Sequence, residues 1–199
     1  MIDVGGQLPR TYFDRPTTEI ARDLIGCRLV RIETQPNQQV RTSGIITETE
    51  AYCGETDLGC HAKAGHTART APLYGPPGFS YVYFTYGMHW LFNVVTRPEG
   101  KPEAVLIRAI QVDEGLERVA ERRGKVAQKY WTDGPAKLTQ ALRIGERHNQ
   151  LDLCDPKAII FIELGENVAD NLIDIGPRIG LYSVPEPWKS KPWRYLARI

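Results

Sequence analysis

SGIITETEAY, at residues 43–52, is the clearest strand in this sequence. Its β-branched residues follow a similar run, CRLVRIET at 27–34, and QPNQQ at 35–39 has the composition of a turn between the two. Two β-rich runs separated by a short polar turn are typical of a hairpin. We therefore expect residues 27–52 to form an antiparallel pair of strands.

The rest of the chain mixes helices and strands without regular alternation of the two. This mixture favours an α+β fold: a single domain with a largely antiparallel sheet, surrounding helices and a protruding β-hairpin. Residues 55–78 are rich in Gly, Pro, Thr and His, and a loop of that length is usually functional or disordered. The tail at 177–199 is expected to be irregular. The other expected elements are helices at 15–26, 113–124 and from Ala136 to about Arg143, and strands at 80–95 (two, around Tyr86-Gly87), 103–111 and 157–164.

The composition is that of one globular domain spanning residues 1–199. The chain is 42% hydrophobic and 25% charged, which is ordinary for such a domain. No apolar run has the length of a membrane span, and the first residues lack a secretory pattern. We therefore expect a cytoplasmic monomer, nucleoid-associated if the source is bacterial. The net charge of +1 neither requires nor excludes DNA, since a nucleic-acid site needs only basic residues gathered on one face.

A candidate catalytic carboxylate lies in the run ETEAY at 48–52. Side chains alternate between the faces of a strand, so Glu48, Glu50 and Tyr52 share one face. A carboxylate beside an aromatic ring at a strand end suits a general base that activates water. The alternative is that both glutamates lie on the solvated face of an edge strand, since an unusual carboxylate marks a site only statistically.

The hairpin at 80–95 and the strand at 103–111 each contain one further candidate. Tyr86 falls at the hairpin tip, where an aromatic ring either enters a base stack as a wedge or lies along the sheet. Tyr81 and Tyr83 share one face of the same hairpin. Arg108 stands among apolar residues, so it is expected to be paired. It belongs either to a structural Arg–Glu pair or to a catalytic group.

Two other patterns bear on ligand binding. The group of Cys53, Cys60, His61 and His66 matches no zinc spacing, so no metal is expected and His61 is free for a pocket or surface role. GPAK at 134–137 opens a helix, where backbone N–H groups and Lys137 could hold a phosphate. A plain helix start with a solvated lysine is the alternative.

The order of these patterns resembles that of the alkyladenine DNA glycosylase family, which is the mammalian type of 3-methyladenine DNA glycosylase. The resemblance runs from about residue 21 to about residue 198. Its most specific parts are the spacing from ETEAY to His61 and the hairpin YVY-xx-YGM. It rests on ETEAY (48–52), His61, YVYFTYGM (81–88), Asn93, LIRAI (106–110), GPAKLTQAL (134–142) and RIG (178–180).

The resemblance implies roles for the residues nearest the chemistry. Glu50 is the implied general base, and Arg108 and the main-chain carbonyl of Ile179 are implied to help it hold the attacking water. Tyr86 is implied to fill the gap that an extruded nucleotide leaves, from the minor groove. We also expect Lys137 and Arg178 to contact phosphates.

The resemblance also implies a pocket for the extruded base. Tyr52, His61 and Tyr83 would sandwich it, with the backbone at His61 reading its edge. Asn93 would stand at the pocket mouth and exclude bases with an unwanted exocyclic amino group.

The implied partner is double-stranded DNA that contains damaged purines. The protein would flip out 3-methyladenine, 7-methylguanine, hypoxanthine or ethenoadenine and hydrolyse the N-glycosidic bond, leaving an abasic site. No cofactor or metal is implied. No lysine falls on the catalytic strand to form a Schiff base, so no lyase activity is expected. Two alternatives remain: a non-catalytic nucleic-acid-binding module of the same fold, and a hydrolase of free nucleosides that uses Glu48 and Glu50.

Overall fold

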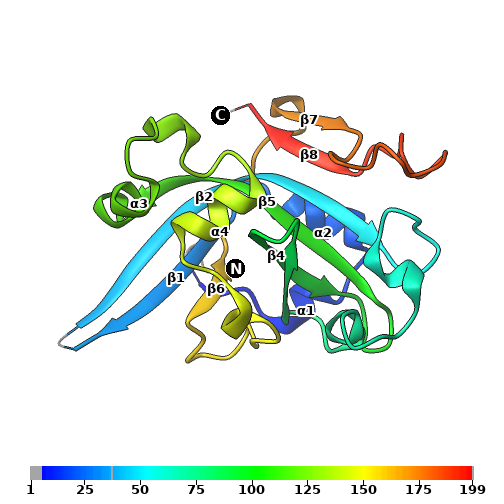
Figure 1. Ribbon diagram of the computed structural model, residues 1–199, viewed down its shortest axis with the longest axis horizontal. Helices are drawn as coiled ribbons and strands as arrows, with labels where there is room; N and C mark the ends of the chain where they lie inside the picture. Colours follow the sequence, from blue (N-terminus) through cyan, green and yellow to red (C-terminus); the bar gives the residue numbers. More distant parts are fainter. Residues whose placement is uncertain (1–5, 37, 199) are drawn as a thin grey trace.

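The computed structural model describes residues 6–36 and 38–198. Within these ranges the chain forms one eight-stranded sheet, and all its strand pairings are antiparallel. Four α-helices and several short 3-10 helices accompany it. Figure 1 shows the long strands β2 and β5 crossing the middle of the molecule, with β7 and β8 along one edge. The expected α+β fold with an antiparallel sheet is confirmed.

The strand order of the sheet is β3-β4-β5-β2-β1-β6, and β8 pairs with both β2 and β7. The elements are the helices α1 (Arg10–Phe13), α2 (Thr17–Asp23), α3 (Leu116–Arg123) and α4 (Pro135–Ala141), and the strands β1 (Arg28–Gln35), β2 (Gln38–Cys53), β3 (Ser80–Thr85), β4 (His89–Thr96), β5 (Glu103–Glu114), β6 (Ile160–Glu163), β7 (Ile173–Gly176) and β8 (Arg194–Ala197). The 3-10 helices are η1 (His61–Ala64), η2 (Ala71–Tyr74), η3 (Gln128–Tyr130), η4 (Glu146–His148) and η5 (Asp170–Leu172).

Strand β2 holds the sheet together because three other strands pair with it. β5 follows one of its edges. The other edge is shared between β1, which pairs as far as Ile45, and β8, which pairs at Glu48–Glu50. Glu50 therefore lies on a strand with partners on both sides, and the alternative of a solvated edge strand does not apply.

Two of the three irregularities in the pairing of β2 with β5 lie on either side of Glu48, which pairs with Ala109. Thr47 on β2 and Arg108 on β5 are each skipped in the register. An extra residue in one strand bends that strand and redirects its side chain. Arg108 is thereby placed where it contacts both glutamates of β2, as described below.

Helix α2 covers one face of β2. Ile20 and Ala21 are fully buried, and the Thr49 hydroxyl donates a hydrogen bond to the Ala21 carbonyl at 2.6 Å. Since side chains alternate along a strand, Glu50 points to the opposite face. Helix α4 packs on β4 of the β3–β4 hairpin, where the Thr139 hydroxyl donates to the Trp90 carbonyl at 2.7 Å.

The structure corrects the expectation of an irregular tail. Residues Arg194–Ala197 form β8, and Ile173–Gly176, for which no strand was expected, form β7. Strands of four residues are too short to show a period. They form because the second half of β2 offers an edge that β1 does not cover.

Several other boundaries also differ from those expected. Helix α1 was not expected, and the strand expected at 157–164 is confined to β6. Strand β5 runs to Glu114, so the helix expected from residue 113 begins at Leu116, after Gly115 turns the chain with a φ of 76°. The segment at 55–78 contains η1 and η2. None of the helices described is long and apolar enough to cross a membrane.

Candidate active site

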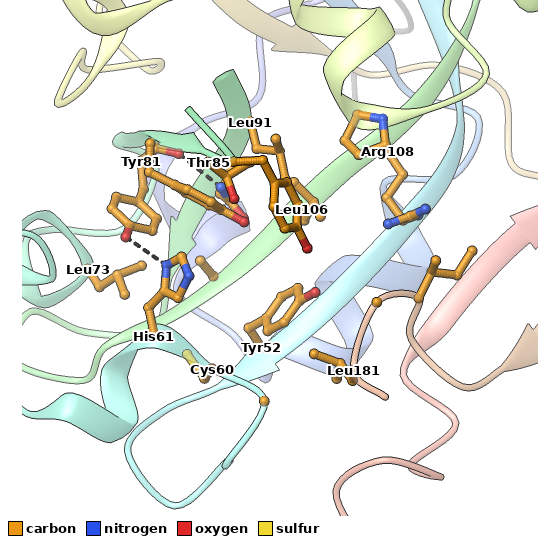
Figure 2. Close-up of a pocket in the computed structure, with 18 residues that line it drawn as sticks. Tyr52, Cys60, His61, Leu73, Tyr81, Thr85, Leu91, Leu106, Arg108 and Leu181 are labelled. Carbon is orange, nitrogen blue, oxygen red and sulfur yellow. Dashed lines mark hydrogen bonds between the residues drawn. The ribbon is translucent and has the colours of Figure 1, made fainter. Parts of the chain in front are cut away.

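A cavity of about 370 Å³ lies where the end of β2, the β3–β4 hairpin, β5 and the loop at 179–181 meet. Its volume is near the lower end of the range for small-molecule sites, roughly 300–1,000 Å³. Seven of the ten residues expected to act in catalysis, base binding or DNA binding line it, namely Tyr52, His61, Tyr83, Tyr86, Asn93, Arg108 and Ile179. Much of the remaining lining is apolar and includes Leu73, Leu91, Leu106 and Leu181 (Figure 2).

Aromatic rings from three different segments form the walls of the cavity. The His61 ring meets the Tyr83 ring edge to face, with 4.5 Å between centroids, and His61 Nδ1 lies 3.0 Å from the Tyr81 hydroxyl. In Figure 2 the Tyr52 ring lies between His61 on one side and Arg108 on the other. Flat aromatic walls favour stacking against a planar ligand. The structure thus brings together the three residues expected to sandwich a base.

His61 carries no charge at neutral pH. Its burial, together with the positive charges of Arg69 and Lys63, lowers the pKa of His61 to about 4. A neutral imidazole does not repel a positively charged ligand, so the cavity can accept either a neutral or a cationic ring.

Glu50 has no exposed surface and lies immediately behind the cavity wall. Three groups that belong to lining residues contact its carboxylate. The Tyr52 hydroxyl donates to Oε2 at 2.8 Å, the Ile179 N–H donates to Oε1 at 2.6 Å, and Arg108 Nη1 lies 3.2 Å from Oε1. A carboxylate has about four acceptor positions. Oε2 therefore keeps one position beyond the bond from Tyr52.

The environment of Glu50 strengthens it as a base. Burial raises its pKa, and this effect exceeds the lowering by Arg108, by the Ile179 amide and by Tyr52. Burial and the charge of Glu50 also raise the pKa of Tyr52 well above its usual value, so Tyr52 keeps the proton that it donates. A carboxylate with a raised pKa accepts a proton more readily, which is what general-base catalysis requires.

Arg108 is both a buried ion-pair partner and a neighbour of the candidate base. Its Nε donates to Glu48 Oε1 at 2.9 Å, while its Nη1 contacts Glu50. Arg194 of β8 donates to the same Glu48 oxygen at 2.5 Å. The two arginines balance the two glutamates. Glu48 is thereby committed to a structural role, and it does not line the cavity.

Tyr86 at the hairpin tip is 82% exposed. Gly87 has a φ of 67°, which glycine adopts readily, but Tyr86 also has a positive φ, of 52°. A left-handed conformation costs a residue with a side chain roughly 1–2 kcal/mol. Packing does not compensate for this cost, because the ring lies in solvent. Strain of this kind is concentrated at functional sites.

Asn93, which was expected at the mouth of the pocket, lines the cavity and is only 4% exposed. Its side-chain amide donates to the Tyr81 carbonyl at 3.0 Å. This bond crosses from β4 to β3, where Asn93 and Tyr81 are paired. The side chain is therefore held in one orientation relative to the cavity.

The two residues expected to contact phosphates lie outside the cavity lining. Lys137 is partly exposed on α4 and donates to Asp133 at 2.8 Å. Arg178 contradicts the expectation, because its side chain has no exposed surface and its guanidinium is paired with Asp57. A phosphate cannot reach a guanidinium that is enclosed in this way.

Sequence reasoning missed Asp57 and Arg194. Asp57 is one of several polar residues in the segment 55–78, and nothing local distinguishes it. Its partner Arg178 is 121 positions away along the chain. Arg194 lies in the tail, whose strand was not expected. No sequence signal could have assigned either pair, because each depends on contact between distant segments.

Comparison with known proteins identifies the family. The family model described as methylpurine-DNA glycosylase matches residues 11–198. Relatives that carry the name "Putative 3-methyladenine DNA glycosylase" include proteins of Carboxydothermus hydrogenoformans (43% identical, covering 96% of this chain and 95% of the relative), Myxococcus xanthus (40%, covering 96% and 90%) and Methanocella arvoryzae (42%, covering 94% and 90%). With nearly the full length matched in each case, this chain belongs to the methylpurine-DNA glycosylase family, a family of enzymes.

Proposed function

We propose that this protein releases alkylated or deaminated purines from double-stranded DNA by hydrolysing the N-glycosidic bond with a water that Glu50 activates. One observation carries the proposal. A buried carboxylate with a raised pKa and one unused acceptor position stands behind the wall of an aromatic cavity. The cavity can hold the extruded purine, and the carboxylate can accept a proton from the attacking water.

The damaged nucleotide must leave the duplex before its glycosidic bond can reach Glu50. Unstacking costs a few kcal/mol, and least for a damaged or mismatched base. The exposed ring of Tyr86 lies at the edge of the same cavity and fills the gap left in the stack. Its strained turn presents the ring outward, away from the sheet.

Glu50 takes a proton from the water as the water oxygen bonds to C1′ of the deoxyribose. The glycosidic bond breaks, its electron pair leaves with the purine, and an abasic site remains. Arg108 and the main chain at Ile179 border both the carboxylate and the cavity, so they orient the water. A cationic base such as 3-methyladenine leaves as a neutral molecule and needs no acid.

The cavity favours damaged over normal purines in two ways. Aromatic faces attract cations by about 0.5–2 kcal/mol, and the neutral ring of His61 adds no repulsion. The buried amide of Asn93 lies in the wall that a base edge would meet, and it disfavours an unwanted exocyclic amino group such as the 2-amino group of guanine. A cationic purine therefore gains free energy on entering, enough to offset this effect for an alkylated guanine, whereas neutral guanine gains none.

The geometry argues against the two other functions. A nucleoside hydrolase with two carboxylates requires both to face the substrate, but Glu48 is bound by Arg108 and Arg194. No lysine lines the cavity within the described part of the chain, so water is favoured over an amine as the nucleophile. A protein that only binds DNA does not need a buried carboxylate with a raised pKa, such as Glu50, behind the cavity.

The test is release of free purines from duplexes that contain a single hypoxanthine or ethenoadenine, and from methylated bulk DNA. We expect the wild-type protein to release them and to leave intact strands with abasic sites. Glu50→Gln keeps the size of the side chain and one acceptor oxygen for the Ile179 N–H, but it cannot take a proton, so release should fall by about 10²–10⁴-fold while lesion binding persists.

The matched control is Glu33→Gln, which alters a poorly exposed glutamate on β1 that pairs with Arg122 away from the cavity. It should release base at the wild-type rate. Wild-type release by Glu50→Gln would refute the mechanism. Binding without release by the wild type would favour the DNA-binding module, and activity on free nucleosides alone would favour the nucleoside hydrolase.

A further inference from the structure

The most enclosed ion pair of the described residues joins Arg178 to Asp57, and neither side chain has any exposed surface. Arg178 Nη1 lies 2.5 Å from Asp57 Oδ2, and Nη2 lies 2.8 Å from Oδ1, so the contact is bidentate. Burying two charges is costly unless the geometry is excellent, so such a pair is weak evidence of a gain in stability. It calls for another explanation.

The pair connects three segments that meet at the candidate active site. Arg178 Nη1 also donates to the carbonyl of Ala51 on β2, next to Glu50, at 3.0 Å. Asp57 accepts the N–H groups of Cys53 at 3.1 Å and Gly59 at 2.9 Å. The pair therefore joins the end of β2, the loop that leads to His61 and the loop that begins at Arg178.

The guanidinium of Arg178 also fixes the ring that contacts the base. Its carbon lies 4.7 Å from the centre of the Tyr52 ring and 5.0 Å from that of Trp193. Tyr52 lines the cavity and donates to Glu50, and the residue after Arg178 is Ile179, whose N–H is the other neutral donor to Glu50. Arg178 thus lies next to both neutral donors to Glu50, the Tyr52 hydroxyl and the Ile179 N–H.

We propose that Asp57 and Arg178 are positioning residues that hold the Ile179 N–H and the Tyr52 hydroxyl on the carboxylate of Glu50. This inference rests on the proposed function, because positioning matters only if Glu50 acts as the base. Neither residue contacts the substrate. Their effect passes through the two hydrogen bonds that orient the carboxylate and lower its pKa.

The test uses three variants that weaken the pair to different degrees. Arg178→Lys keeps the charge but loses the bidentate contact, and Asp57→Asn keeps the shape but loses the charge. Gly59→Ala keeps both charges but places a Cβ 2.8 Å from Arg178 Nη2 and from the Leu181 side chain, so one of them must move. The matched controls are Arg122→Lys and Glu33→Gln, which weaken another poorly exposed pair, between β1 and α3.

We expect the three variants to lower the single-turnover rate of base release by about 10- to 100-fold, since small misplacements near the reacting groups have effects of that size. Affinity for the lesion duplex should change much less. The acidic limb of the rate profile should move to higher pH, because the lost donors normally lower the pKa of Glu50. The controls should leave the rate per folded molecule and the acidic limb unchanged, even where they lower the unfolding temperature.

A second measurement does not depend on activity. The Ile179 amide proton, bound to a carboxylate, should give a downfield NMR signal that shifts upfield in Arg178→Lys but not in the controls. An unchanged signal and an unchanged acidic limb in folded Arg178→Lys and Gly59→Ala would overturn the positioning role. If the wild type released no base, the proposed function itself would fail, and a wild-type rate in these variants would refute only the positioning.

Discussion

At the scale of the residue, the site depends on a carboxylate that is buried but not saturated with hydrogen bonds. Glu50 accepts a hydrogen bond from Tyr52 on one carboxylate oxygen. The other oxygen accepts one from the Ile179 N–H and contacts Arg108. The donors prevent the buried charge from being neutralised outright, and burial still raises its pKa. The balance between the two effects gives a base that is stronger than an ordinary glutamate.

This balance predicts the pH dependence of base release. The rate should fall as the pH is lowered through the pKa of Glu50, and the midpoint should lie above the usual value of 4.5 because burial raises it. Tyr52→Phe removes a donor that lowers this pKa, so its acidic limb should lie at still higher pH. Single-turnover rates between pH 4 and pH 9 would measure the acidic limbs of the wild type and of Tyr52→Phe.

The control for this prediction is Tyr195→Phe, which removes another buried hydroxyl. Tyr195 pairs with Thr49, so it lies on the α2 side of the sheet, opposite Glu50. Its profile should coincide with that of the wild type. Equal shifts in the two variants would show that the limb does not report on the contacts of Glu50.

At the scale of the element, the β3–β4 hairpin combines two packed strands with a strained tip. Tyr81 and Tyr83 pack at the cavity, and Asn93 bridges the two strands. The tip holds Tyr86 in a left-handed conformation with its ring in solvent. The hairpin thus gives up local stability to display an aromatic ring, which is useful only if a ligand meets it.

We therefore expect that relieving the strain at the tip raises the stability of the protein but weakens its binding to a lesion. Tyr86→Asn should raise the free energy of unfolding by about 1 kcal/mol, because asparagine tolerates the left-handed region. The same change should weaken binding to a lesion duplex about tenfold or more, as expected when a base-stacking aromatic is lost. Urea unfolding and fluorescence anisotropy would measure the two effects.

Tyr86→Phe is the matched control, since it keeps the ring and the strain and should change neither quantity much. A loss of stability together with a loss of binding in Tyr86→Asn would indicate a packing role for the tyrosine instead.

At the scale of the whole molecule, two histidines link stability to pH. Burial lowers the pKa of His148, like that of His61, to about 4. Below pH 6.5 the unfolded chain binds protons at both rings, while the folded protein does so only near pH 4. The unfolded state therefore binds more protons in this window, and stability falls as the pH is lowered through it. Glu50 acts in the opposite direction, since its raised pKa favours the folded state in acid.

We predict that the free energy of unfolding decreases between about pH 7 and pH 4. His148 is 1% exposed, and its ring alone should account for up to roughly 3 kcal/mol of the decrease. His148→Asn offers an oxygen to the Gly145 N–H in place of Nδ1 and cannot gain a proton, so its profile should be flatter. Urea unfolding at a series of pH values would test this, and parallel profiles would contradict it.

Much of the fold could be predicted because it rests on local patterns. The apolar and β-branched runs indicated β1, β2, β3, β4 and β5, and Gly87 indicated the hairpin turn. The alternation of ETEAY correctly placed Glu50 and Tyr52 on one face, since alternation is a property of any extended chain. The order of the motifs also led to the right family.

The remaining features come from contacts between distant segments, and no local pattern encodes them. The skipped residue Arg108 reaches both glutamates only because the register of β2 and β5 shifts there. The Ile179 amide meets Glu50 across 129 positions of sequence, and Arg178 turned from an expected phosphate ligand into the enclosed partner of Asp57. The amino-acid order thus specified the elements and the kinds of side chain at the site. Their hydrogen bonds and burial, and hence the basicity of Glu50, depend on how the segments pack, because only packing removes water and sets the distances between charges.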